Sequence, residues 1–250
     1  MREQIDTIPV NDAFDAGDEC PFCHLERRSE QMIMRYVAGP CASYMEPDVR
    51  AVTDKKGFCS GHMKKLYDYG NTLGAALMLQ THMAGLLEQF QLERENYAQP
   101  AKKKLFGKNK VETDGALPAR LQERVQSCYF CDRIEQDMHR YYATFFALIQ
   151  DPEFRKKVES GKGFCLRHFA QLLEKAEGRL PGKHQAWFYE TVFSVMEENL
   201  VRVKGDLDWL VAKYDYRNAG ADWKNSRDAL PRTMQKLQGI YPADPPYKKD

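Results

Sequence analysis

Six of the seven cysteines of this chain belong to a pattern that occurs twice, and each copy of the pattern ends in a histidine. Each copy opens with Cys-x-x-Cys and continues with Gly-Phe-Cys-x-x-His, and the second and third cysteines are separated by 35 intervening residues in one copy and 33 in the other. Three thiols and one imidazole form a complete tetrahedral ligand set for zinc. The candidate ligands are Cys20, Cys23, Cys59 and His62 in the first copy, and Cys128, Cys131, Cys165 and His168 in the second. The pattern predicts two zinc ions per chain, each held by the four residues of one copy.

The spacing within each copy suits this chemistry. Two cysteines separated by two residues can direct both sulfurs to one ion, and Cys59 and His62, three apart, lie on one face of a helix. Gly57 and Gly163 suit a sharp backbone turn into that helix. The N-terminal end of a helix dipole also stabilises a thiolate. We therefore expect each site to form where two helix starts meet.

Basic residues near each copy are candidate partners for the metal centres, because three thiolates and a neutral imidazole around Zn²⁺ leave one negative charge. The candidates are Lys56, Lys162, Arg50, Arg155 and Arg167. Arg50 and Arg155 occupy matching positions in the two copies, so they either offset the metal charge or form structural salt bridges. Arg167 has no counterpart and is expected to be an ordinary surface charge.

Other chemistries fit parts of the pattern. The residues could be free buried thiols with two packed histidines, ligands of an iron–sulfur cluster with a histidine, or redox-active dithiols. Cys20-Pro-Phe-Cys23-His24 also matches a c-type haem motif, but Asp132 stands in place of His24 in the second copy.

Signatures of catalysis are missing from the sequence. A catalytic zinc keeps one coordination position open, whereas four protein ligands per site predict closed, structural sites. The chain has no P-loop, no nucleophile elbow and no His-Glu-x-x-His motif. The sequence therefore favours a protein that is not an enzyme, with an active site between two modules as the alternative.

Composition limits the classes of partner and the cellular location expected for the protein. The 250 residues carry a formal net charge of +1, which gives no general argument for binding nucleic acid or an anionic membrane. The N-terminus lacks the apolar core of a signal peptide, and no stretch approaches a membrane span. We therefore expect a cytoplasmic protein, where Cys-x-x-Cys pairs serve as ligands or redox groups more often than as disulfides.

Hydrophobic periodicity predicts an all-α protein. Apolar residues recur at helical spacing after both Cys-x-x-Cys pairs, and two longer segments follow, with Leu73, Leu87 and Phe90 along one face of the first. Pro47 and Pro152 mark breaks between helices. No segment shows the sustained alternation of a strand.

The repetition predicts two tandem homologous helical modules, each stapled by a Cys3His metal site. The expected boundaries are residues 1–97 for the N-terminal module, 98–125 for a basic linker and 126–216 for the C-terminal module. Residues 217–250 are expected to form a tail with a possible short helix around Arg232–Leu237.

The arrangement resembles an uncharacterised bacterial family of unknown function, whose members carry Cys-Pro-x-Cys, a Tyr-Met-Glu-Pro-Asp-Val-Arg-like segment and Gly-Phe-Cys-x-x-His. In this chain the corresponding segments are Cys20–Cys23, Tyr44–Arg50 and Gly57–His62, and Ile8–Phe14 is similar to the start of the family. Some members are labelled "ABC transporter substrate-binding protein", which the absence of an export signal does not support. The resemblance implies a shared fold and shared ligand positions, and it implies no activity.

These observations lead to one main hypothesis, a zinc-binding helical scaffold whose partner is another protein. The alternatives are an iron–sulfur or dithiol redox protein and an enzyme with a site between the modules. The sequence leaves the partner and the oligomeric state open.

Overall fold

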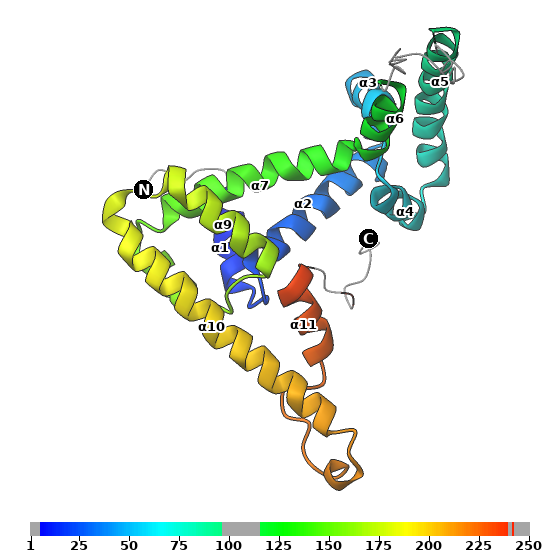
Figure 1. Ribbon diagram of the computed structural model, residues 1–250. Coiled ribbons are helices and arrows are strands. Elements are labelled where there is room, and N and C mark those ends of the chain that lie inside the picture. Colours follow the sequence, from blue (N-terminus) through cyan, green and yellow to red (C-terminus); the bar gives the residue numbers. More distant parts are fainter. Residues whose placement is uncertain (1–5, 97–115, 240–241, 243–250) are drawn as a thin grey trace, which may run out of the picture. The chain divides into compact units, whose positions relative to one another are not determined.

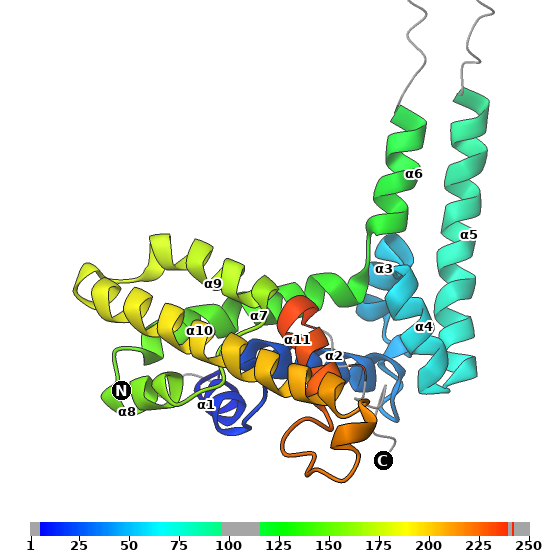
Figure 2. The same ribbon diagram turned by 60° about the horizontal axis from the view of Figure 1, so that its bottom comes forward.

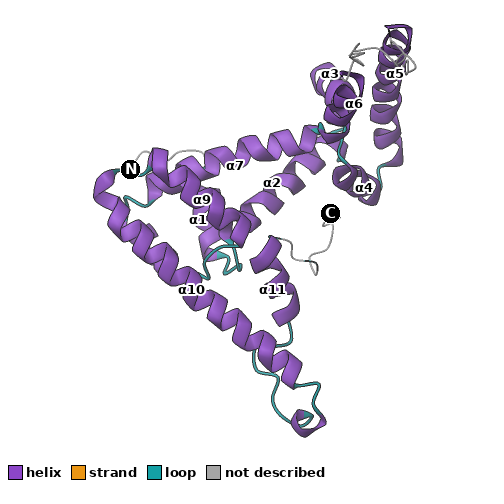
Figure 3. Cartoon of the chain, in the orientation of Figure 1, coloured by secondary structure: helices purple, strands orange, loops and turns teal. Residues whose placement is uncertain are grey.

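The computed structural model describes residues 6–96, 116–239 and 242, and every regular element among them is helical (Figures 1 and 3). The predicted all-α class is confirmed for this part of the chain. The helices are α1 (Thr7–Asp15), α2 (Pro21–Ala38), α3 (Pro47–Lys56), α4 (Ser60–Tyr69), α5 (Thr72–Asn96), α6 (Ala116–Gln126), α7 (Tyr129–Leu148), α8 (Pro152–Glu159), α9 (Leu166–Arg179), α10 (Gly182–Ala212) and α11 (Ala229–Gln238), with short 3₁₀ turns at Ser43–Met45 and Tyr216–Asn218.

The chain divides into two compact units, which do not follow the predicted module boundaries. Among the described residues, unit 1 combines residues 6–29 with 135–239 and 242, and unit 2 combines residues 30–96 with 116–134. The divisions fall inside α2 and α7, the two helices that begin at the Cys-x-x-Cys pairs. Each unit therefore takes residues from both sequence copies.

Unit 1 has an aromatic core that joins its helices. Phe22 of α2 stacks on Tyr142 of α7 with ring centroids 4.2 Å apart, and Phe14 of α1 meets Phe154 of α8 at 4.9 Å. Phe22 and Phe145 are completely buried. Burial of such large apolar rings is the main source of stability in a unit of this size.

The short helix expected in the tail is α11, and it is an integral part of unit 1. It packs on α9 and α10, and its side chains Arg232, Gln235 and Lys236 are buried. The sequence predicted it only as a possible short helix in a tail outside both modules. Burial of these polar groups is accounted for by ion pairs and hydrogen bonds, as shown below.

Unit 2 is built around α3, α4 and α5, with α3 packed on α5. The helix α6, which lies in the predicted linker, runs beside α5 (Figure 2) and is tied to it by hydrogen bonds from Arg120 to Glu93 and from Arg124 to Gln89. The rest of that linker, residues 98–115, lies outside the described residues. Leu73 and Leu87 on the predicted face of α5 are 67% and 55% exposed, so that face is not part of the core. None of the described helices combines the length and apolar character that crossing a bilayer requires.

Candidate metal centres

The eight predicted ligands form two clusters, but each cluster takes two residues from each sequence copy. We call them centre 1, which contains Cys20, Cys23, Cys165 and His168, and centre 2, which contains Cys59, His62, Cys128 and Cys131. The predicted pairing, in which Cys20 and Cys23 share an ion with Cys59 and His62, is therefore wrong. Each Cys-x-x-Cys pair meets the Cys-x-x-His pair of the other copy, and each centre lies within one unit.

Distances within the two clusters match the edges of a zinc coordination tetrahedron. With Zn–S of about 2.3 Å and Zn–N of about 2.0 Å, a regular tetrahedron has S···S edges of about 3.8 Å and S···N edges of about 3.5 Å. In centre 1, Nδ1 of His168 lies 3.3–3.4 Å from the three sulfurs, and Cys23 Sγ lies 3.6 Å from Cys165 Sγ. In centre 2, Nδ1 of His62 lies 3.2–3.4 Å from the three sulfurs, and Cys59 Sγ lies 3.8 Å from Cys131 Sγ. Both clusters have the size that one tetrahedral ion requires.

Helix starts position the ligands of centre 1. The Asp18 carboxylate accepts a hydrogen bond from the Cys20 amide at 3.1 Å, just before α2 begins. Cys165 is the N-cap of α9, and its sulfur accepts a hydrogen bond from the His168 amide at 3.4 Å. Gly163 has φ +74°, a conformation that favours glycine, as the predicted sharp turn requires. Two helix N-termini thus direct their positive ends toward the thiols.

Centre 2 is assembled in the same way from α4 and α7. Cys59 is the N-cap of α4, and the preceding Gly57 has φ +63°. The Tyr129 amide donates a hydrogen bond to the Gly57 carbonyl at 3.0 Å, which joins the two ligand loops directly. The buried ring of Phe130, inside the Cys-x-x-Cys motif, stacks on His62 with centroids 5.1 Å apart.

Glutamates of α2 lie behind both histidines. Nε2 of His62 is 2.9 Å from Glu30 Oε1, and Nε2 of His168 is 3.7 Å from Glu26 Oε2. A carboxylate that holds the outer nitrogen of a metal-binding histidine fixes its ring and its tautomer. The repeat pattern hid these residues, because the matching positions in α7 are Ile134 and Met138.

The protonation of centre 2 reflects these contacts. Burial lowers the pKa of His62, but hydrogen bonds with Cys128 and Glu30 outweigh burial and raise that pKa to about 10. Burial raises the pKa of Cys128, yet its hydrogen bond with His62 brings the pKa down to about 6. The pair therefore favours an imidazolium beside a thiolate, and a metal ion that binds Nδ1 must displace this proton.

Of the basic residues near the centres, Arg167 differs from the expectation, whereas Arg50 and Arg155 follow the structural one of their two alternatives. Arg167, expected to be an ordinary surface charge, forms a bidentate ion pair with Glu26 beside His168. Arg155 donates to the Ile149 carbonyl at 2.7 Å, and Arg50 donates to Thr81 at 3.2 Å. Arg50 and Arg155 thus occupy matching positions because they tie neighbouring helices together. Repetition indicated a shared structural role here, not a role at the ion.

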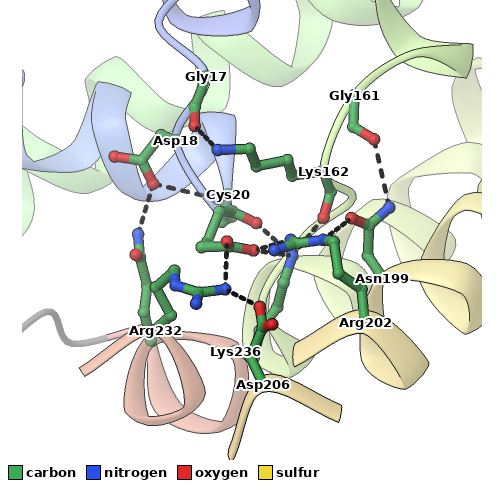
Figure 4. A network of polar contacts seen from close by, with 12 residues as sticks. Gly17, Asp18, Cys20, Gly161, Lys162, Asn199, Arg202, Asp206, Arg232 and Lys236 are labelled. Carbon is green, nitrogen blue, oxygen red and sulfur yellow. Dashed lines mark hydrogen bonds and ion pairs between the residues drawn. The ribbon is translucent and has the colours of Figure 1, made fainter. Parts of the chain in front are cut away.

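A network of ion pairs and hydrogen bonds surrounds Glu19, the residue before the centre 1 ligand Cys20 (Figure 4). Glu19, next to Cys20, is only 4% exposed and pairs with Arg202 at 2.5 Å and with Lys236 of α11 at 3.2 Å. Burial opposes ionisation of Glu19, but the Arg202 hydrogen bond and the Lys236 charge lower its pKa below the usual value. Lys236 also donates to the Glu19 carbonyl at 2.5 Å. The network therefore fastens α11 against the loop that presents Cys20.

The two centres differ in exposure. All four residues of centre 1 are at most 1% exposed, and Gly239, at the end of α11, lies so close to the sulfurs that a larger residue there would make tight contacts with them. A methyl group at Gly239 would lie 3.3 Å from Cys165 Sγ and 3.4 Å from Cys23 Sγ. In centre 2, Cys128 is buried, but Cys59 is half-buried and Cys131 is exposed. The same donor set is thus enclosed in unit 1 and open on one side in unit 2.

Comparison with known proteins agrees with the resemblance in sequence. The model of the "Family of unknown function (DUF6062)" matches residues 1–244. This chain belongs to that family. A curated relative of this DUF6062 member, an uncharacterized 23.9 kDa protein in the xynA 3' region of Caldicellulosiruptor sp. (strain Rt8B.4), is 26% identical over 204 residues, which cover 80% of this chain and 85% of the relative. No solved structure matches the chain.

Proposed function

We propose that centre 1 and centre 2 each bind one zinc ion, and that the protein is a zinc-stabilised helical scaffold for a partner, which we expect to be another protein in the cytoplasm. The observation that carries this proposal is the pair of tetrahedral donor sets, since in each set three thiols and one imidazole lie within 4.8 Å of one another. Thiolate and imidazole are the ligands that structural zinc sites use.

The spacing of the donors favours one ion over a cluster of several. Ligands of an iron–sulfur cluster are divided between two or more iron atoms, so the four donor atoms cannot all stand at the edge length of one tetrahedron. In each centre, Nδ1 of the histidine lies 3.2–3.4 Å from all three sulfurs. This spacing leaves room for one ion and argues against the iron–sulfur alternative at both centres.

The number of donors favours structural ions over catalytic ones. A catalytic zinc keeps a position for water or substrate, whereas here four protein atoms surround the space for each ion. Each ion would join parts of the chain that are far apart in the sequence. Cys23 and Cys165 are 142 residues apart, and His62 and Cys128 are 66 residues apart. Two such links fix the fold in a way that suits a scaffold.

The order of the helices supports a duplication as the origin of the two modules. In both halves a helix begins at Cys-x-x-Cys, a second begins at a proline, a third follows the Cys-x-x-His cysteine, and a long helix follows. These are α2 to α5 in the first half and α7 to α10 in the second. We infer that the modules exchange their Cys-x-x-Cys helices, so that each ion is held by both.

The metal content of the protein tests this function. Protein purified without added metal or chelator and without oxygen should contain two zinc ions per chain by inductively coupled plasma mass spectrometry. A Cys59→Ser variant should contain one ion, because only centre 2 loses a ligand. Iron in place of zinc, or a metal-free protein whose thiols all titrate, would overturn the proposal.

A further inference from the structure

We propose that centre 2 is an oxidation-sensitive zinc site, at which a peroxide joins Cys59 to Cys131 as a disulfide and thereby releases the ion, while centre 1 keeps its own. This inference rests on the zinc function proposed above. It assigns different roles to two centres with identical donors.

The two centres differ in the access of solvent to their sulfurs, whereas their sulfur–sulfur distances are similar. Cys23 Sγ and Cys165 Sγ are 3.6 Å apart in centre 1, and Cys59 Sγ and Cys131 Sγ are 3.8 Å apart in centre 2. Cys23 and Cys165, which make the first pair, are 1% and 0% exposed. Cys131 is exposed and Cys59 half-buried, so a small oxidant in water reaches the second pair. Susceptibility of a thiol to oxidation follows its thiolate character and its exposure.

The cover over centre 1 is built into the fold. Lys236 and Gly239 belong to the end of α11 that lies against this centre. Lys236 donates to the Glu19 carbonyl, and a methyl group at Gly239 would lie within 3.4 Å of two sulfurs. Arg167 and Glu26 form an ion pair beside His168. An oxidant reaches these sulfurs only if α11 first moves away.

The reaction at centre 2 is a two-electron oxidation by hydrogen peroxide or another peroxide. The Cys131 thiolate attacks one peroxide oxygen, an S–O bond forms, the O–O bond breaks, and hydroxide leaves. The Cys59 thiolate then attacks the Cys131 sulfur, an S–S bond forms, the S–O bond breaks, and a second hydroxide leaves. Two protons convert the hydroxides to water. The ion loses two of its four ligands and departs, and a dithiol reductant reverses the change.

The positions of the two cysteines make this change tolerable for the fold. Cys59 precedes the first residue of α4, and Cys131 lies in the first turn of α7. A disulfide between them keeps α4 joined to α7 when the ion leaves, so a covalent link replaces the metal link. His62 stays paired with Glu30, and Phe130 stays packed on His62. Unit 2 thus has two linked states, one with zinc and one with a disulfide.

The test uses the full-length protein with Cys41→Ser, because Cys41 is exposed, lies outside both centres and would consume peroxide. Zinc is first counted per chain without oxygen, and two ions are expected. Fewer than two at this stage would contradict the zinc function itself, independently of the oxidation. Hydrogen peroxide is then added in small steps with a chromogenic zinc chelator present, and free thiols are alkylated before peptide mass spectrometry.

The expected result is release of one zinc ion per chain, a peptide pair linked through Cys59 and Cys131, and restoration of two bound ions by dithiothreitol and zinc. The inference is overturned if both ions leave together, if neither leaves, or if the main product joins Cys23 to Cys165 or Cys128 to Cys131. Alkylation of zinc-loaded protein without peroxide is a second measurement. Cys131 and Cys59 should react before any cysteine of centre 1, and equal reaction of both centres would also refute the inference.

Discussion

The crossed pairing of ligands makes an unambiguous prediction for two matched double variants. Cys23→Ser with Cys165→Ser removes two ligands of centre 1 from different sequence copies. Cys23→Ser with Cys59→Ser removes two ligands from one copy but damages both centres. The first variant should keep one zinc ion per chain and the second should keep none. Pairing within each copy requires the opposite result.

The separations along the chain give the expected loss of stability. If a metal link acts like a covalent cross-link on the unfolded chain, closing 142 residues between Cys23 and Cys165 stabilises the fold by about 5 kcal/mol. Closing the 66 residues between His62 and Cys128 contributes about 4 kcal/mol. The variant that loses both centres should therefore be about 4 kcal/mol less stable than the variant that loses centre 1 alone.

Zinc content by mass spectrometry and unfolding by urea, followed by circular dichroism, measure both quantities. Cys41→Ser is the control, because it changes an exposed cysteine outside the centres and should retain both ions. If the variant that loses both centres aggregates, the zinc content of the Cys23→Ser and Cys165→Ser variant still tests the crossed pairing. A Cys23→Ser and Cys165→Ser protein without any zinc would refute the crossed arrangement.

Three further predictions concern the surroundings of the ions. Glu30→Gln should weaken zinc binding at centre 2 about 10- to 100-fold in a chelator competition. Glu26→Gln should have a smaller effect at centre 1, because the Glu26 carboxylate is 3.7 Å from His168. Equal effects of the two substitutions would contradict the role of Glu30. Gly239→Ala should weaken centre 1 and lower the melting temperature more than Gly17→Ala, since both glycines have positive φ but a methyl group at Gly17 meets nothing within 4 Å. Lys236→Met should cost about 1–3 kcal/mol in urea unfolding, because the Glu19 carbonyl loses its donor while Arg202 still pairs with the Glu19 carboxylate; a change below 1 kcal/mol would show that the network is not needed.

Ligand identity could be predicted from the sequence because it is a local property. Cys-x-x-Cys and Cys-x-x-His each place two donors at one helix start, and any arrangement of the chain keeps those pairs together. The glycine turns were predictable for the same reason, since φ at Gly57 and Gly163 depends on the residue itself. The resemblance to a family was equally readable, because it rests on short motifs.

The pairing of the half-sites could not be predicted, because the two copies are chemically equivalent. Each Cys-x-x-Cys fits either Cys-x-x-His, and chain entropy separates the choices weakly. Closing 142 residues instead of the 36 between Cys23 and Cys59 costs only about 1 kcal/mol more. Side-chain packing outweighs that difference. Phe22, next to Cys23, stacks on Tyr142 and on Phe164, and both partners belong to the second copy.

The exposure of the two centres could not be predicted from the sequence, for a different reason. It depends on α11, which begins more than 60 residues after His168 and which the sequence predicts only as a possible short helix in a tail. Its charged side chains are buried because Glu19 and backbone carbonyls satisfy Lys236, a match that no local pattern encodes. One helix placed by tertiary contacts thus gives two identical donor sets different exposure to solvent. The enclosed set suits a permanent link, and the open set can respond to what the solvent contains.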